Sequence, residues 1–253
     1  MDKPFAGQVA LVTGGSSGIG RAAALAFAAR GARVAVASRR SEESLETVRL
    51  IEAASGEAFF ARTDVTRADE VAALVAQTAA RYGRLDFAFN NAGIEGDPFI
   101  PLHKYSEDMW DSVVAINLKG VFLSMKYELP QILKNGGAIV NMASVAGLAG
   151  GRMGAAYHAS KHGVVGITKA AAMEYADKGV RINAVAPAVI ETAMADRAFF
   201  HDPAIAARVT GLHPVGRVGT PEEVANAVVW LCSREASFTT GHTFPVDGGF
   251  LVP

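Results

Sequence analysis

Residues 8–21 read QVALVTGGSSGIGR, an apolar run followed at once by Gly14, Gly15, Gly18 and Gly20. The apolar run is typical of a strand buried on both faces of a parallel sheet. A glycine-rich turn between a strand and a helix lets the backbone approach a pyrophosphate at the helix N-terminus. It is not a Walker A loop, because Arg21 and Ala22 stand where Lys and Ser/Thr would be needed. Its spacing also differs from G-x-G-x-x-G. The stretch therefore predicts a strand, a phosphate-binding turn and a helix.

The alternation of an apolar run and a helix-like segment continues along the whole chain. Six further short apolar runs alternate with helix-like segments, at 32–38, 57–62, 86–90, 138–144, 180–187 and 242–248. Cap signals at Ser41, Thr66, Ser106 and Thr220 predict the starts of four helices. Such alternation predicts one doubly wound α/β domain over residues 1–253, with helices on both faces of a parallel sheet.

The longest interruption of this alternation is the segment 189–213, VIETAMADRAFFHDPAIAARVTGLH. Met194, Phe199 and Phe200 lie in it among polar residues. Long connections in compact domains are often lids or binding loops. We expect a substrate lid here, and a pair of short helices packed on the body is compatible with that interpretation.

Composition limits the classes of partner. Lys and Arg number 24 against 25 Asp and Glu, for a formal net charge of -1, which does not favour nucleic-acid or polybasic membrane binding. Cys232 is the only cysteine, so we expect a reducing compartment and a buried, inert thiol. The amino-terminal apolar stretch is too short for a secretory signal, and no apolar run reaches membrane-spanning length. We expect a cytoplasmic protein with a small-molecule partner.

Residues 157–162 read YHASKH and contain three residue types able to do chemistry. On a helix, Tyr157 and Lys161 share one face, and His158 and His162 share another. The histidine pair lacks the Glu of the H-E-x-x-H zinc signature, so we predict no metal site. We expect Tyr157 and Lys161 to face the chemistry and the histidines to face away from it.

The ordered set of motifs resembles a classical short-chain dehydrogenase/reductase, from about residue 7 to residue 249. The motifs are TGGSSGIG at 13–20, NNAG at 90–93, Asn117, Ser144 and Tyr157-x-x-x-Lys161. This resemblance implies a seven-stranded Rossmann-type sheet, a nicotinamide cofactor and a homotetramer. It also implies a catalytic group made of Asn117, Ser144, Tyr157 and Lys161.

The resemblance also places the cofactor. NAD-using relatives carry an acidic residue at the end of the second strand, where this chain has Ser38, Arg39 and Arg40. Arg39 can offer a charge-assisted contact to a 2′-phosphate, so we predict NADP(H) in preference to NAD(H), which remains possible. The cofactor-binding residues expected by resemblance are Gly14, Ser16, Ser17, Gly18, Ile19, Gly20, Ser38, Arg39, Arg40, Asp64, Val65, Asn91, Ala92, Gly93, Tyr157, Lys161, Pro187, Ile190 and Thr192. Ala188 replaces a glycine usual in the family, which casts doubt on the local loop geometry.

The implied reaction interconverts a ketone and a secondary alcohol by hydride transfer. Tyr157 would act as general acid in reduction and general base in oxidation. Its ordinary pKa is about 10, and we expect the Lys161 cation to lower it. By resemblance Lys161 also holds the nicotinamide ribose, Ser144 positions the substrate oxygen, and Asn117 holds a water that links Lys161 to solvent.

The expected substrate pocket is largely apolar and favours a hydrophobic ketone. We assign it Ser144, Val145, Ile94, Met153, Phe199 and Phe200. Acyl-carrier β-ketoesters, steroids, sugars and small alcohols all stay open as substrates. The alternatives are an NAD-dependent alcohol, sugar or steroid dehydrogenase of the same family, and a non-catalytic dinucleotide sensor. An extended-branch epimerase would need a further substrate domain, for which the chain has no room.

Overall fold

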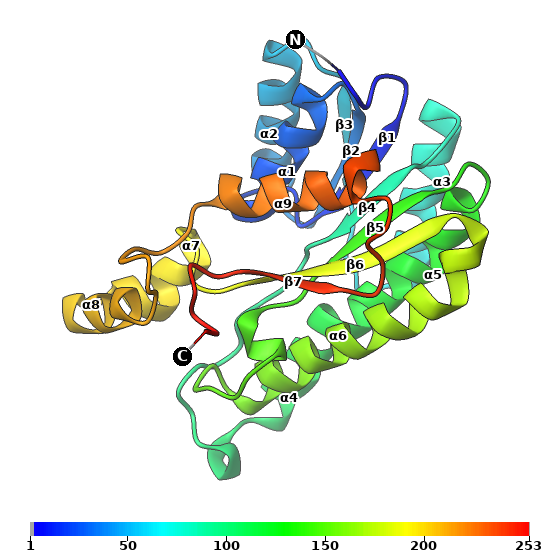
Figure 1. Cartoon of the computed structure of the whole chain (residues 1–253). Coiled ribbons are helices and arrows are strands. Elements are labelled where there is room, and N and C mark those ends of the chain that lie inside the picture. Colours follow the sequence, from blue (N-terminus) through cyan, green and yellow to red (C-terminus); the bar gives the residue numbers. More distant parts are fainter. Residues whose placement is uncertain (1–2, 253) are drawn as a thin grey trace.

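The computed structural model of the protein describes residues 3–252, and it confirms the doubly wound α/β fold. Seven parallel strands form one sheet in the order β3-β2-β1-β4-β5-β6-β7 (Figure 1). Their bounds are β1 Val9–Thr13, β2 Arg33–Ser38, β3 Ala58–Arg62, β4 Phe87–Asn90, β5 Gly137–Met142, β6 Val180–Pro187 and β7 Thr243–Val246. Each strand lies within one of the seven apolar runs of the sequence, except that β5 begins one residue earlier.

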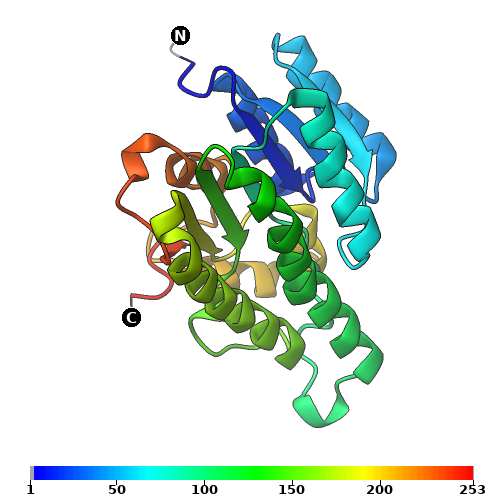
Figure 2. The ribbon, with the colours of Figure 1, turned by 90° about the vertical axis from the view of Figure 1, so that its right-hand side faces the viewer.

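Helices cover both faces of the sheet, since its strands are apolar on both sides. One face is covered by α1 (Gly18–Ala29), α2 (Ser41–Ala53) and α9 (Pro221–Cys232). The other is covered by α3 (Ala68–Tyr82), α5 (Gly120–Ile132) and α6 (Ala155–Tyr175), which lie in front of the sheet in Figure 2. Helix α4 (Glu107–Val114) continues through a π-helical turn, Ala115–Lys119, into α5. Four 3-10 turns complete the regular structure, at Leu102–Lys104, Val145–Gly147, Ala176–Lys178 and Arg234–Ala236.

Two of the four predicted caps are confirmed. The Ser106 hydroxyl accepts the Met109 N–H at the start of α4, and Thr220 forms a capping box at the start of α9. The other two predictions were wrong. Helix α2 already includes Ser41, and its N-cap is Arg40, whose N–H donates to the Ser38 hydroxyl. The N-cap of α3 is Arg67, and the Thr66 hydroxyl donates to Asp64 Oδ1.

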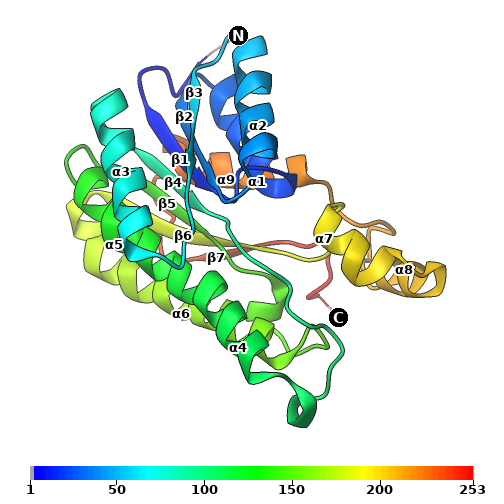
Figure 3. The same ribbon diagram turned by 180° about the vertical axis from the view of Figure 1, so that it is seen from behind.

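The carboxyl ends of β1 and β4 meet at the point where the strand order changes direction, with Thr13 paired to Asn90. Ligands of open α/β sheets bind outside this point. The segment 189–213 folds into α7 (Ala193–Ala195), a π-helical turn (Asp196–Phe200) and α8 (Pro203–Gly211). Figures 1 and 3 show α7 and α8 projecting beyond the ends of the strands. The segment is thus placed beside the expected binding crevice.

Between residues 3 and 252, none of the helices is both long enough and apolar enough to cross a bilayer.

Cys232 is buried in α9, and burial raises the pKa of its thiol to about 12. A thiol with so high a pKa stays protonated and unreactive at neutral pH, as the sequence predicted.

Candidate active site

The glycine-rich loop has the geometry of an anion site. Gly14 and Gly18 have φ of 66° and 51°, a region that favours glycine. Ser17 precedes α1 without capping it through its side chain, so the first helical N–H groups remain available to a ligand. Two side chains brace the loop from behind: the Thr47 hydroxyl donates to Gly15 O (3.0 Å), and Arg21 Nη2 donates to Ser16 O (2.6 Å).

Asn91 joins this loop to the end of β4. Its Nδ2 donates to Thr13 O (3.1 Å) and Gly14 O (3.2 Å), and the Thr13 hydroxyl accepts the N–H groups of Asn91 and Ala92. A Cβ on Gly14 would lie 2.7 Å from Asn91 Nδ2, so a larger residue would force the two strand ends apart. The carboxyl end of β1 and the carboxyl end of β4 are thereby held in a fixed position relative to each other.

Two arginines lie at the end of β2. Arg40 Nη2 donates to the hydroxyls of Ser16 (2.8 Å) and Ser17 (2.6 Å), which ties β2 to the glycine-rich loop. Arg39 Nη1 lies 3.8 Å from Asp64 Oδ2. Ser38 presents a hydroxyl, not a carboxylate. The side chain of Val65 packs into a buried cluster under α5, which leaves only its backbone for ligand contact.

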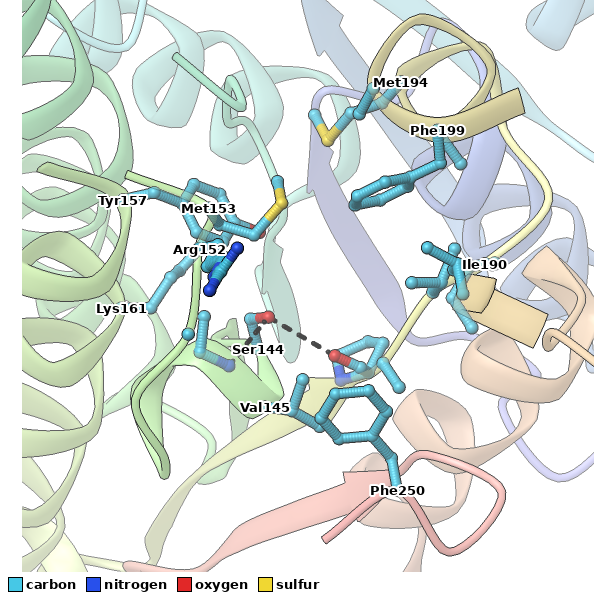
Figure 4. A pocket seen from close by; sticks show the side chains of 18 of the residues that line it. Ser144, Val145, Arg152, Met153, Tyr157, Lys161, Ile190, Met194, Phe199 and Phe250 are labelled. Carbon is cyan, nitrogen blue, oxygen red and sulfur yellow. Dashed lines mark hydrogen bonds between the residues drawn. The ribbon is translucent and has the colours of Figure 1, made fainter. Parts of the chain in front are cut away.

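A cavity of about 600 Å³ opens beside the carboxyl ends of β4, β5 and β6. Figure 4 shows Tyr157 and Met153 on one side of it, with Ile190, Met194 and Phe199 opposite. Of the residues assigned to the nicotinamide half and the substrate pocket, those that line it are Ile19, Asn91, Gly93, Ile94, Ser144, Val145, Met153, Tyr157, Lys161, Pro187, Ile190, Thr192 and Phe199. Phe200 does not line the cavity, so its assignment to the pocket was wrong. It is the last residue of a π-helical turn, and its neighbour Phe199 lines the cavity.

Tyr157, Lys161 and Ser144 converge at this cavity. Helix α6 brings Lys161 Nζ to 5.6 Å from the Tyr157 ring centroid, as expected for residues one turn apart. Lys161 is buried, and its Nζ donates to Met142 O at 2.8 Å. The Ser144 hydroxyl accepts the Ala146 N–H (3.2 Å) and donates to Pro187 O (3.4 Å; Figure 4). A phenol, an ammonium and a hydroxyl thus share one end of a largely apolar cavity.

The titration of this pair differs from the sequence-based prediction. Burial raises the pKa of Tyr157 above its usual value, and the Ser144 hydroxyl offsets part of that rise. Burial also lowers the pKa of Lys161 to about 7. For the chain by itself, the prediction that Lys161 lowers the pKa of Tyr157 was wrong, because desolvation is the largest influence on both groups.

Asn117 lies behind the cavity, in the π-helical turn between α4 and α5. It pairs with the backbone of Ile94 in both directions, with Nδ2 donating to Ile94 O and Oδ1 accepting the Ile94 N–H, both at 2.9 Å. Its Nδ2 also reaches the Ser160 hydroxyl on α6 (3.3 Å). Asn117 thus fixes the chain after β4 against the helix that carries Tyr157 and Lys161. Single π-helical turns of this kind are common at functional sites.

The segment after β6 keeps its expected place despite Ala188. Among residues 3–252, only Ser55 and Phe99 combine a side chain with a positive φ, so Ala188 is free of that strain. Ile190 is buried and pairs with Gly219, and the Thr192 hydroxyl caps α7 by accepting the Ala195 N–H. A Cβ on Gly18 would lie 3.1 Å from Thr192 Cγ2, so the glycine-rich loop and this segment face each other across the crevice.

The expectation that both histidines face away from the chemistry was wrong for His158. The loop 145–151 folds over the start of α6, and His158 Nδ1 lies 2.9 Å from Ala146 O and 3.2 Å from Ala149 O. Its ring consequently forms part of the cavity wall, whereas His162 is exposed. The expected lid 189–213 contributes Met194, Ile205 and Arg208 to the lining, and the loop before α6 contributes Arg152. Phe250, near the carboxyl end, also lines the cavity, and the sequence did not indicate it.

Comparisons with known proteins show the family of the chain. The family described as "Enoyl-(Acyl carrier protein) reductase" matches residues 14–251. The chain is 44% identical to "Cyclohexanol dehydrogenase" of Acinetobacter sp. (strain SE19), over 99% of this chain and 97% of that one. It is 43% identical to "2,5-dichloro-2,5-cyclohexadiene-1,4-diol dehydrogenase" of Sphingobium indicum (strain B90A), over 98% of each chain. The structure of levodione reductase superposes with a TM-score of 0.92 at 39% identity, covering 97% of this chain and 98% of that one. The chain therefore belongs to the short-chain dehydrogenase/reductase family and is an oxidoreductase of alcohols and carbonyl compounds that uses a nicotinamide nucleotide.

Proposed function

We propose that the protein is an NADP(H)-dependent oxidoreductase that interconverts a secondary alcohol and a ketone on a six-membered alicyclic ring. The observation that carries this proposal is the convergence of Ser144, Tyr157 and Lys161 on an apolar cavity that adjoins the glycine-rich loop. The cofactor, when bound, supplies or accepts the hydride.

In ketone reduction, Tyr157 gives its hydroxyl proton to the substrate oxygen, and in alcohol oxidation it takes that proton back. Ser144 donates a hydrogen bond to the same oxygen and so favours the developing negative charge. Lys161 faces the ring of Tyr157 and, when charged, favours the phenolate over the phenol. Asn117 keeps the chain after β4 in register with α6, so that the two walls of the site stay together.

Preference for NADP(H) rests on the end of β2. Ser38 puts no negative charge where a 2′-phosphate would lie, Arg40 contacts the glycine-rich loop, and Arg39 lies beside it in the sequence with its guanidinium 3.8 Å from Asp64. Arg40 already bridges to the hydroxyls of Ser16 and Ser17, so we assign it a share of the phosphate contact beside Arg39. The partial engagement of Arg39 with Asp64 favours the alternative, NAD(H), and only a direct comparison of the two nucleotides decides between them.

The ring substrate is supported by the walls of the cavity. Ile94, Val145, Met153, Ile190 and Met194 give it flexible and branched apolar surfaces suited to a saturated ring. Both curated relatives described above are named for six-membered carbocyclic alcohols. The many hydroxyls of a sugar ring would find few partners against these walls.

The test is the initial rate of NADPH oxidation, with NADH in parallel, on cyclohexanone, a linear ketone, an aryl ketone and a β-ketoester. We expect cyclohexanone to have the highest kcat/KM, with NADPH preferred, and Tyr157→Phe to remove turnover while NADPH still binds. Higher kcat/KM on the β-ketoester than on cyclohexanone would refute the ring substrate. Tight NADPH binding with no turnover on any ketone would favour the dinucleotide sensor.

We also propose a homotetramer. Trp110 on α4 and Phe122 on α5 are exposed large apolar side chains on the same connected helical unit. Helix surfaces of this kind are stabilised when a second copy covers them. The molar mass in solution, measured by light scattering, tests this: a mass near four chains of 26.4 kDa supports it, and a monomer refutes it.

A further inference from the structure

The cavity carries an imbalance of charge. Its lining residues include Arg152 and Arg208 beside Lys161, and within the described chain they include neither Asp nor Glu. The formal charge of the whole chain is close to zero, so this excess of positive groups is local. Neither hydride transfer nor the proton transfer by Tyr157 uses either arginine.

Arg208 is placed toward the cavity by its position on α8. The lining residues of this segment are Ile205, Arg208, Val209 and Leu212, which lie at the i, i+3, i+4 and i+7 spacing of one helix face. Arg208 thus interrupts the apolar face that α8 turns to the site. A charged residue on such a face keeps its guanidinium at the rim and lays its methylenes along the apolar wall.

Arg152 belongs to the other side of the cavity. It lies in the loop before α6, and its carbonyl accepts the N–H of Phe99 at 2.8 Å, which fixes the backbone from which the side chain extends. Figure 4 shows Arg152 on the same side as Tyr157 and Met153, facing the side of Ile190, Met194 and Phe199. The two guanidinium groups therefore come from elements on different sides of one opening.

Neither guanidinium has a hydrogen-bond or ion-pair partner among residues 3–252. Arg197 on the same segment as Arg208, by contrast, pairs with Glu95. Arg152 and Arg208 thus retain all their donors for a ligand, and a planar guanidinium fork fits a carboxylate.

We propose that the substrate carries a carboxylate on the alicyclic ring, away from the carbon that bears the oxygen, and that Arg152 and Arg208 bind it. The inference rests on the proposed ring ketone and alcohol substrate and names the subclass, a hydroxycycloalkane or oxocycloalkane carboxylic acid. The ring fills the apolar part of the cavity, its oxygen meets Tyr157 and Ser144, and its acid group lies at the opening between the two arginines. These arginines determine specificity and touch no reacting atom.

The test compares 4-oxocyclohexanecarboxylate with its uncharged methyl ester, for the wild type, Arg152→Gln, Arg208→Gln and the double variant. We expect the wild type to prefer the acid by about tenfold or more in kcat/KM, and each single variant to lose roughly fivefold of that preference, the order expected for a partly exposed charge pair. The loss should fall mainly on KM, and the preference should decrease with added salt. Turnover of the ester stays within about twofold in all variants and shows that they fold. Arg49→Gln, on the surface of α2, is the matched control and leaves the ratio unchanged.

Two outcomes would overturn the inference, and they differ in what they say of the proposed function. If the ester is turned over at least as well as the acid, or if the preference survives in the double variant, the carboxylate site is refuted and the ring substrate stands. If neither the acid nor the ester is turned over while another ketone class is, the proposed ring substrate is refuted and this inference with it.

Discussion

Glu128 gives the chain a pH dependence that can be calculated from its surroundings. It lies on α5 with only 1% of its surface exposed, against the centre of the sheet. Its Oε2 accepts the Asn90 Nδ2 (3.0 Å), and the same Nδ2 donates to Asn141 Oδ1 (3.0 Å). Within the described residues, Glu128 Oε1 and Asn90 Oδ1 have no hydrogen-bond partner. No cation contacts the carboxyl group, so burial raises its pKa to about 8, against an ordinary value of 4.5.

The size and sign of the effect follow from these two values. Below pH 4.5 the carboxyl is protonated in both the folded and the unfolded chain, and it contributes no pH dependence. Between pH 4.5 and pH 8 the unfolded chain releases the proton first, so the free energy of unfolding falls as the pH rises. A difference of about 3.5 pKa units corresponds to at most about 5 kcal/mol, reached above pH 8.

Glu128→Gln should remove this dependence, because an amide stays neutral at every pH. Its oxygen can still accept from Asn90 Nδ2, and its N–H groups offer a donor that Asn90 Oδ1 lacks. We expect a free energy of unfolding close to that of the wild type at pH 4.5, and a gain of a few kcal/mol at pH 9. For a chain of this length that is a rise in Tm of roughly 5–15 °C.

The measurement is urea unfolding, followed by circular dichroism at pH 5, 7 and 9, at one fixed protein concentration, since subunit association would shift the midpoint. The control is Glu46→Gln, an exposed carboxylate on α2, for which the difference from the wild type should stay small at each pH. A constant difference between Glu128→Gln and the wild type from pH 5 to pH 9 would show that Glu128 does not titrate in this range and would refute the reasoning.

Three further substitutions test the site. Lys161→Met in the cofactor-free chain should raise the free energy of unfolding at pH 6, and this gain should disappear toward pH 10. The reason is that burial lowers the pKa of Lys161 from 10.5 to about 7, so the buried ammonium destabilises the wild type most at low pH. Thermal unfolding at both pH values measures this, and an equal gain at pH 6 and pH 10 contradicts it. Arg40→Gln should weaken NADPH binding by about tenfold and change NADH binding little, as measured by fluorescence titration. Equal losses of affinity for both nucleotides would show that Arg40 only holds the glycine-rich loop through Ser16 and Ser17. Arg197→Gln should remove the 2.8 Å contact between the segment 189–213 and Glu95. We expect KM to rise up to about fivefold and proteolysis of the segment to become faster. Unchanged proteolysis would show that this ion pair does not hold the segment against the body of the protein.

The fold could be predicted because its signals are local and repeated. Each strand is a short apolar run that needs no partner to be recognised, and the glycine-rich turn places the first strand beside a helix. Helix starts were less certain because a capping hydroxyl has competing partners. Thr66 lies one residue before Arg67, the N-cap of α3, and donates its hydroxyl to Asp64, whereas Ser106 and Thr220 stand at the N-cap position itself.

The walls of the cavity could be predicted only in part, because they depend on how distant loops fold. Helical periodicity correctly put Tyr157 and Lys161 on one face, but it could not show that the loop 145–151 would cover the face of His158. Phe199, and not Phe200, of a π-helical turn lines the cavity, and no local sequence signal marks such a turn. The spacing from Ile205 to Leu212 did hold a readable helix face, in which Arg208 is the exception.

Burial raises the pKa of Tyr157 and lowers the pKa of Lys161. These opposite shifts indicate how a bound nucleotide would change the protonation of Lys161. The Lys161 ammonium has three N–H donors, and among residues 3–252 it has one acceptor, Met142 O. A buried cation with unused donors is costly, which is why its pKa falls to about 7. The same unused donors suit it to the hydroxyls of a nucleotide ribose, and hydrogen bonds to its charged form would raise its pKa again. A cation restored beside Tyr157 would then favour the phenolate that alcohol oxidation requires. We therefore expect the proposed proton transfer by Tyr157 to be coupled to occupation of the nucleotide crevice, because Lys161 would be more fully charged at neutral pH once its donors are satisfied.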